Sequence, residues 1–151
     1  MDPSPANILI VDDIEDNLEI LGDLLKFDGY NVQTARSGVS ALKRVQEAHP
    51  DLILLDVIMP GLDGFETCRR LKSCPTTQDI PVIFMTAVTD TDEKLKGFEL
   101  GAVDYITKPI QAKEVLARVH THLTIQRLQR EMKAALHREA EQKRRLSPGS
   151  P

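Results

Sequence analysis

The sequence has few of the features that would indicate a secreted or membrane protein. Its 151 residues include only two cysteines, Cys68 and Cys74, too few for a disulfide scaffold. No apolar run approaches the roughly 20 residues that a membrane-spanning helix needs. Residues 1–7 lack a basic region followed by an apolar stretch, so no signal peptide is indicated. We therefore expect one cytoplasmic domain with reduced thiols and no membrane span.

Charge is distributed unevenly along the chain. Residues 126–146 carry seven Lys/Arg and three Glu, a local charge of +4, although the whole chain has a formal charge of −4. The body is therefore acidic and the C-terminal stretch basic. This basic stretch contains no aromatic residue and no recognisable DNA-binding fold, so direct nucleic-acid binding is not expected.

Short apolar segments recur along the chain and predict five strands. Three of them are continuous runs of aliphatic residues, Phe and Met, which is typical of strands buried on both faces of a parallel sheet. Two shorter segments complete the set. The predicted strands cover residues 8–11, 31–35, 52–55, 82–85 and 104–107.

The segments between the strands have apolar residues at helical spacing. Ser37-Gly38 opens the second of these helices and His49-Pro50 closes it. Strands and helices alternate, which predicts an α/β fold of type (βα)5, a parallel sheet with helices on both faces. The predicted core stripes are Ile14, Leu18, Leu21, Leu25; Val39, Leu42, Val45; Phe65, Cys68, Leu71; and Leu95, Phe98.

The last helix is predicted to continue beyond the sheet, from Ala112 to Leu146, about 50 Å at 1.5 Å per residue. We expect residues 6–124 to form the domain and residues 125–146 a projecting helix. Its apolar residues have the 3, 4, 3 spacing of a short coiled-coil seam, and a solvated charged helix or a linker to an output domain are the alternatives. Residues 147–151 are expected to be a disordered tail. The seam consists of Ile125, Leu128, Met132 and Ala135.

Acidic residues follow two of the predicted strands at their C-terminal ends. Asp12 and Asp13 come after the first strand, Asp56 after the third, and Lys108 after the fifth. In parallel sheets these ends meet at one edge, where ligands bind. Carboxylates gathered there repel one another unless one is protonated or a cation lies between them, and hard oxygen ligands suit Mg²⁺. A lysine beside such a site indicates phosphate chemistry. Taken singly, each residue also has an ordinary interpretation, such as helix capping by Asp12 or Asp13.

Taken together, these residues resemble the receiver domain of two-component response regulators, of the chemotaxis-regulator type, across residues 6–123. Any one of the motifs is weak, but their order at successive strand ends is specific. The resemblance implies a flavodoxin-like, doubly wound sheet with strand order 2-1-3-4-5. The matching motifs are Asp12-Asp13, Asp56 with Met59-Pro60 and Gly64, Thr86-Ala87, Asp104-Tyr105 and Lys108-Pro109.

The resemblance also implies a role for each site residue. Asp56 would accept a phosphoryl group from a sensor histidine kinase or phosphotransfer protein. Mg²⁺ would be bound by Asp13, Asp56 and the backbone carbonyl of Ile58, with Asp12 binding directly or through water. Lys108 and Thr86 would each contact a phosphoryl oxygen. Movement of Thr86 would let Tyr105 rotate inward and change the surface of the fourth helix and fifth strand.

Partner surfaces are also implied by the resemblance. A charged set matches positions that pair across a symmetric homodimer in the winged-helix branch of the family, although Glu114 and Arg118 are also an ordinary i,i+4 helix pair. Output would pass through a downstream protein effector, through dimerisation, or through a domain outside this chain. The candidate dimer face consists of Lys94, Asp104, Glu114 and Arg118.

We therefore expect a phosphoacceptor that assists its own phosphoryl transfer and is not otherwise an enzyme. Ile58 and Val88 are apolar where many relatives carry polar residues, which predicts slow dephosphorylation because water is excluded. The alternative is a phosphorylation-independent scaffold or dimerisation module acting through the long last helix. A flavodoxin-type nucleotide binder is disfavoured because no phosphate-binding loop follows the first strand and the two aspartates there would repel FMN.

Overall fold

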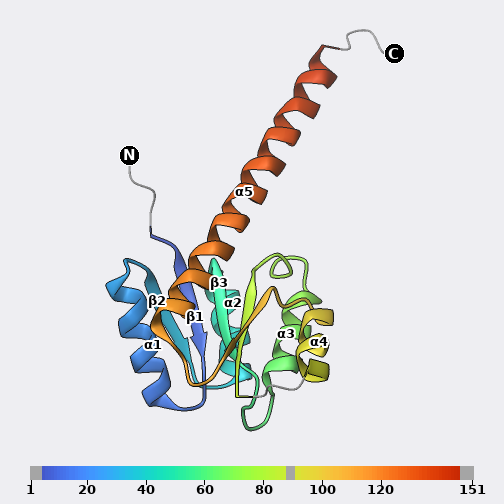
Figure 1. Cartoon of the computed structure of the whole chain (residues 1–151). Coiled ribbons are helices and arrows are strands. Elements are labelled where there is room, and N and C mark those ends of the chain that lie inside the picture. The colour runs from blue at the N-terminus through green and yellow to red at the C-terminus, as the bar shows by residue number, and fades with distance from the viewer. Residues whose placement is uncertain (1–4, 88–90, 147–151) are drawn as a thin grey trace.

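The structure is a computed structural model that describes residues 5–87 and 91–146. Five strands alternate with five helices in the described residues, as the sequence predicts (Figure 1). Val88 and the expected tail 147–151 lie outside the described residues. The elements are β1 (Asn7–Val11), α1 (Glu15–Phe27), β2 (Asn31–Ala35), α2 (Gly38–Glu47), β3 (Leu52–Asp56), α3 (Gly64–Lys72), β4 (Val82–Thr86), α4 (Thr91–Glu99), β5 (Asp104–Thr107) and α5 (Ala112–Arg145).

The strands form one parallel sheet in the order β2-β1-β3-β4-β5, which confirms the predicted doubly wound, flavodoxin-like topology. In register, Val11 of β1 lies beside Leu55 of β3, so the residues that follow these two strands meet at one edge. We call this the carboxyl edge, and the opposite edge, where the strands begin, the amino edge. Helices α1 and α5 cover one face of the sheet, and α2 and α3 pack against the other.

Side chains alternate along each strand and supply a core to both faces of the sheet. In β3, Leu52 and Leu54 pack toward α1 and α5, whereas Ile53 and Leu55 pack toward α2 and α3. All five residues of β3 and of β4 are buried, which explains why their sequences are uniformly apolar up to the last residue. The first polar residue of each strand therefore appears at the carboxyl edge.

Helix starts and core stripes agree with the sequence analysis in most places. Ser37 caps α2 by accepting a hydrogen bond from the Ser40 amide at 3.0 Å, and the whole predicted stripe of α3 is buried. Val39 and Ile14 were wrongly assigned to the core: both are exposed. Ile14 precedes the first residue of α1 and Val39 lies in the first turn of α2, so neither keeps to the buried face of its helix.

The stripe predicted for α4 is also wrong. Leu95 is 53% exposed and Phe98 46% exposed, and the buried residue of this helix is Gly97. Tyr105 from β5 fills the space beneath α4: a Cβ atom at Gly97 would lie 1.7 Å from its hydroxyl oxygen. The Tyr105 ring thus fills the space under α4 that helical spacing had assigned to Leu95.

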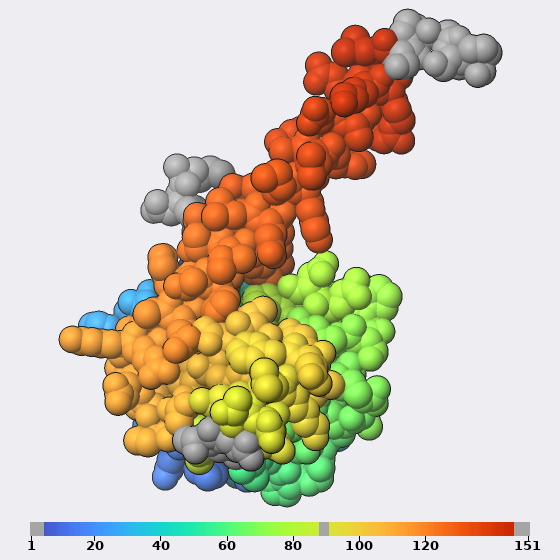
Figure 2. Space-filling view, turned by 45° about the vertical axis from the view of Figure 1, so that its right-hand side comes forward, coloured from blue at the N-terminus to red at the C-terminus, as the bar shows by residue number. Residues whose placement is uncertain are grey.

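Helix α5 is far longer than the sheet, as predicted. It runs antiparallel to the strands and leaves the body past the amino edge, on the side away from the strand C-termini (Figure 1). In the space-filling view its second half stands clear of the body (Figure 2). Ion pairs at the base of this segment join Arg130 to Asp51 at 3.4 Å and Lys133 to Asp79 at 3.6 Å. None of the described helices is long and apolar enough to cross a membrane.

Candidate phosphoryl-transfer site

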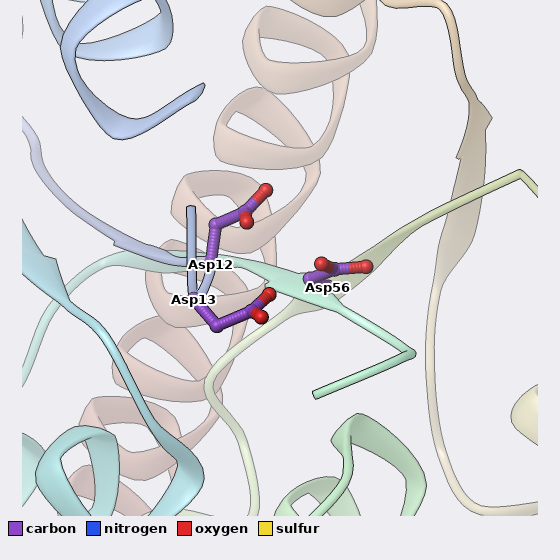
Figure 3. A group of neighbouring side chains, drawn as sticks. All are labelled: Asp12, Asp13 and Asp56. Atoms are coloured by element: carbon purple, nitrogen blue, oxygen red, sulfur yellow. The ribbon is translucent and has the colours of Figure 1, made fainter. Parts of the chain in front are cut away.

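Three carboxylates meet at the carboxyl edge of the sheet. Asp12 and Asp13 directly follow β1, and Asp56 is the last residue of β3, the neighbouring strand. Their side chains lie close to one another (Figure 3). One oxygen of each lies within 4.8 Å of the others. The grouping of Asp12, Asp13 and Asp56 that the sequence predicted is therefore present.

The three carboxylates differ in burial and in hydrogen bonding. Asp12 is fully buried and Asp56 is 4% exposed, whereas Asp13 is half-buried. Asp12 Oδ1 accepts a hydrogen bond from the Ile14 amide at 2.9 Å. Ile14 itself occupies the N-cap position of α1, which has no side-chain cap, so the interpretation of Asp12 or Asp13 as the cap is wrong. Asp12 thus contacts the start of α1 without being its N-cap residue, and it also lies in the site.

Lys108 brings a positive charge to the same place. Its amide donates to the carbonyl of Thr86 at 2.8 Å, which aligns the end of β5 with the end of β4, and the peptide bond to Pro109 is cis. The Lys108 ammonium lies 3.3 Å from Asp12 Oδ2 and 3.2 Å from Asp56 Oδ2. One lysine therefore bridges the two most buried carboxylates.

The charges in this pocket do not balance. Burial raises the pKa of Asp56 above its ordinary value, and Lys108 opposes this increase while Asp12 adds to it. For Lys108, burial lowers the pKa, but Asp56 and Asp12 outweigh it and the net direction is upward. The shared lysine therefore remains charged but is insufficient to stabilise Asp56 fully. Such a site favours the arrival of a further cation.

The loop after β3 folds back over Asp56. The Ile58 amide lies 3.4 Å from Asp56 Oδ1, a long hydrogen bond, so the backbone of Ile58 runs beside the pocket. Gly64 closes the loop, since a Cβ atom there would lie 2.2 Å from the Asp56 carbonyl oxygen. The Ile58 side chain is 64% exposed and thus turns away from the core.

Thr86 is the last residue of β4, and Tyr105 is the second residue of β5, where it pairs with Phe84 of β4. Thr86 is 2% exposed. Tyr105 is already buried, donates its hydroxyl to the Glu93 carbonyl at 3.2 Å, and makes an edge contact with Phe98, so the inward position that the sequence associated with phosphorylation is occupied in this structure. Burial, and then Glu93, raise the pKa of Tyr105 to about 12, so it remains a donor at neutral pH.

The candidate dimer face is only partly assembled within the chain. Arg118 donates to both carboxylate oxygens of Asp104 at 2.7 Å and to Glu114 at 3.3 Å. His122, which the sequence analysis did not assign to this face, lies 2.9 Å from Asp104 Oδ2. Burial opposes ionisation of Asp104, but His122 and Arg118 together lower its pKa. Within the described residues, no hydrogen bond or ion pair joins Lys94 to this network.

Sequence reasoning also missed Asn17. Its amide nitrogen donates to Asp12 Oδ2 at 3.1 Å from the first turn of α1. The residue lines one side of a largely apolar groove of about 500 Å³ between α1 and the segment after β5, which Lys108 and Ile110 line on the other side. A polar residue near the start of a helix gives no signal by itself, so only the fold reveals this contact.

The donor set of the pocket fits Mg²⁺. Among the described residues it consists of carboxylate oxygens, with the Ile58 backbone beside them, and includes no His or Cys side chain. The partly buried negative charge is the environment in which a divalent cation is stabilised most, because the carboxylates would otherwise repel one another. The residues can therefore hold a hard cation and a phosphoryl group in contact with Lys108.

Comparison with known proteins identifies the family. The family model for the response regulator receiver domain matches residues 8–120. Response regulator PleD of Caulobacter vibrioides is 47% identical over 116 residues, which cover 77% of this chain and 26% of PleD. The DNA-binding regulator RpaA of Synechocystis is 41% identical over 132 residues, 87% of this chain and 54% of RpaA.

The solved structures include close counterparts of the body. Chemotaxis protein CheY4 of Vibrio cholerae superposes with a TM-score of 0.75 at 30% identity, and the match covers 78% of this chain and 98% of CheY4. The chain thus spans nearly all of CheY4 but about a quarter of PleD. By sequence and by fold, it belongs to the response regulator receiver domains, the phosphoacceptor domains of two-component signalling.

Proposed function

We propose that Asp56 is the phosphoacceptor and takes a phosphoryl group from a histidine kinase or a phosphotransfer protein. A carboxylate oxygen of Asp56 would attack phosphorus as the P–N bond of the phosphohistidine breaks, and the imidazole would leave with its electron pair and gain a proton. One observation carries this proposal. The Asp56 carboxylate is nearly buried, burial raises its pKa, and it lies 3.2 Å from the Lys108 ammonium.

We infer that Asp12, Asp13, Asp56 and the carbonyl of Ile58 hold Mg²⁺. When bound, the cation supplies charge neutralisation that the single lysine does not provide. Lys108 would pair with one phosphoryl oxygen and Thr86 would offer its hydroxyl to another, so both stabilise the negative charge of the transferring group. These roles fit side chains that converge on one edge of the sheet.

The switch would involve Thr86 and Tyr105. Because Tyr105 is already buried under α4, we infer that phosphorylation stabilises this inward position instead of creating it. Movement of Thr86 toward the phosphoryl group would make room at the ends of β4 and β5 and fix α4 against the ring. The Ile58 side chain is exposed and so does not by itself exclude water from Asp56. The predicted slow dephosphorylation is tested by measuring the rate at which the phosphoryl group is lost.

The output would pass through a protein effector or a homodimer. We infer a domain of residues 6–124 and a projecting helix of residues 125–146 that serves as coiled coil or linker. In this role the chain is a cytoplasmic phosphoacceptor that assists its own chemistry and has no other catalytic cycle. The candidate dimer face of Asp104, Glu114 and Arg118 would have to exchange its internal ion pairs for pairs with a second copy, with Lys94 as a further partner.

The proposal is tested with acetyl phosphate and Mg²⁺. Wild-type protein should gain one phosphoryl group, detected by intact-mass spectrometry, and the Asp56→Asn variant should gain none. Asp51→Asn, which changes an aspartate just before the same strand, is the matched control and should be labelled like wild type. Equal labelling of the Asp56→Asn variant would remove Asp56 from this role.

A second candidate function is a scaffold that is independent of phosphorylation. It is favoured by apolar side chains that stay exposed along the projecting part of α5, at Ile125, Leu128, Met132 and Leu136. A scaffold of this kind should have the same oligomeric state with and without beryllofluoride, measured by gel filtration with light scattering. A shift in state on adding beryllofluoride and Mg²⁺ would favour the switched receiver instead.

A further inference from the structure

Asn17 contacts the site although it belongs to none of the predicted motifs. It is the third residue of α1, and its side chain is half-buried. The amide nitrogen donates to Asp12 Oδ2 at 3.1 Å. Asn17 thus reaches back from the helix to the one carboxylate of the pocket that is completely buried.

The oxygen that Asn17 contacts is shared with Lys108. The Lys108 ammonium lies 3.3 Å from Asp12 Oδ2, and it also lies 3.2 Å from Asp56 Oδ2. In the proposed reaction Lys108 pairs with a phosphoryl oxygen, and its interaction with Asp12 must weaken. A buried carboxylate oxygen that loses its donor is strongly destabilised. The Asn17 amide is the side-chain donor that can stay on this oxygen when the lysine turns away.

Asparagine suits this task better than the residues that a helix would prefer here. The third helical position often carries Glu or Gln, and Asn is one of the weaker helix formers. A Glu would add a fourth carboxylate beside Asp12 and could not donate a hydrogen bond. The neutral amide donates without cancelling the negative charge that attracts a cation.

We propose that Asn17 is a positioning residue, which holds the Asp12 carboxylate in place for Mg²⁺ while Lys108 moves to the phosphoryl group. The inference rests on the proposed function of the pocket and adds a residue to it. Asn17 acts through Asp12 and touches neither the phosphoryl group nor Asp56. It resembles the outer partners of metal ligands, whose loss typically weakens metal affinity or activity by roughly 10–100-fold.

The first test compares Asn17→Leu, which has nearly the same shape but no donor, with Asn17→Gln, which restores an amide. Mg²⁺ affinity is measured by calorimetry on the unphosphorylated protein, and labelling of Asp56 by acetyl phosphate is measured alongside. Asn17→Leu should weaken Mg²⁺ binding by about tenfold, and Asn17→Gln should recover part of the loss. The matched control is Asn31→Leu, at an exposed position where β2 begins, which should bind Mg²⁺ like wild type.

The second test examines the shared oxygen. In a Lys108→Met background Asn17 is the side-chain donor that remains on Asp12 Oδ2 among the described residues, so Asn17→Leu should weaken Mg²⁺ binding more there than in wild type. Equal effects in both backgrounds would overturn the idea that the two donors substitute for each other.

The outcomes separate this inference from the proposed function. If Asn17→Leu lowers the free energy of unfolding in urea but leaves Mg²⁺ affinity and labelling within twofold of wild type, Asn17 is only structural and the inference fails. If wild-type protein is not labelled at all, the proposed function fails, and the Mg²⁺ affinities of the Asn17 variants still decide whether Asn17 positions Asp12.

Discussion

Aspartates at the two edges of the sheet have opposite electrostatic environments. At the carboxyl edge Asp12 and Asp56 share one lysine beside a third carboxylate, Asp13, and burial raises the pKa of Asp56. At the amino edge the described aspartates that form ion pairs each contact a different arginine or lysine: Asp104 contacts Arg118, Asp51 contacts Arg130, and Asp79 contacts Lys133. His122 and Arg118 lower the pKa of Asp104 despite partial burial.

This difference distinguishes the candidate phosphoryl-transfer site from ion pairs that only stabilise the fold. Balanced pairs at the amino edge stabilise the ionised carboxylate and require nothing more. The unbalanced pocket at the carboxyl edge leaves a buried acid short of positive charge, which favours binding of a cation and transfer of a phosphoryl group. Changes at the two edges should therefore differ in size and in the direction of their pH dependence.

The largest effect is expected for Lys108→Met. It leaves Asp12 and Asp56 facing each other without a cation, so the free energy of unfolding without Mg²⁺ should fall by roughly 1–3 kcal/mol at neutral pH. Labelling by acetyl phosphate should slow by about 10²–10³-fold because charge stabilisation is lost. Urea unfolding and intact-mass kinetics measure the two effects. Lys133→Met at the amino edge is the control, and comparable losses there would abolish the contrast between the edges.

The next effect is the pH dependence of Asp56→Asn. A carboxyl group whose pKa is raised in the folded state contributes stability below its unfolded pKa of about 4, and this contribution is lost as pH rises through the folded value. Without Mg²⁺, Asp56→Asn should therefore gain stability relative to wild type as pH rises from about 4 to 8, by about 1.4 kcal/mol for each pKa unit of the shift. Urea unfolding across this range measures the stability difference between the variant and wild type. A difference that stays constant with pH would show that folding does not raise the pKa of Asp56.

The sequence was sufficient to predict the carboxyl edge. Apolar strands end where polar residues begin, and in a parallel sheet those ends must meet, so Asp12, Asp56 and Lys108 could be grouped without coordinates. The long α5 was also predictable, because helix-forming residues continue without Pro or Gly. These features depend on local pattern and on topology alone.

The amino edge and α4 could not be predicted in this way. Arg130 and Asp51 are 79 residues apart, and their contact depends on the direction in which α5 leaves the sheet. Tyr105 occupies the space next to Gly97, so Leu95 and Phe98 stay about half exposed although helical spacing predicted them to be buried. Asn17 was missed for the same reason, since its contact follows from the placement of α1 against the end of β1.

A smaller effect of opposite sign is expected for Asp104→Asn. The lowered pKa of Asp104 contributes stability above its unfolded value, and this is lost as pH falls through the folded value. Asp104→Asn should thus lose stability relative to wild type at neutral pH, by less than about 1 kcal/mol because the ion pair is partly exposed to solvent. The deficit should disappear at low pH in the same titration. If the deficit grew toward low pH, the ion pairs at Asp104 would not be its cause.

The smallest effect is expected for Arg130→Gln, where α5 leaves the body. The Arg130 side chain is 62% exposed and its contact with Asp51 is 3.4 Å long, so the free energy of unfolding should change by at most about 1 kcal/mol. The change should shrink in about 1 M salt, where exposed charges are screened within about 3 Å. Mg²⁺ affinity should not change, because the contact lies at the opposite edge from the pocket. Arg127→Gln is the matched control on the same helix. A shift in Mg²⁺ affinity in the Arg130 variant, absent from the control, would show that the amino edge is coupled to the site and is more than a scaffold.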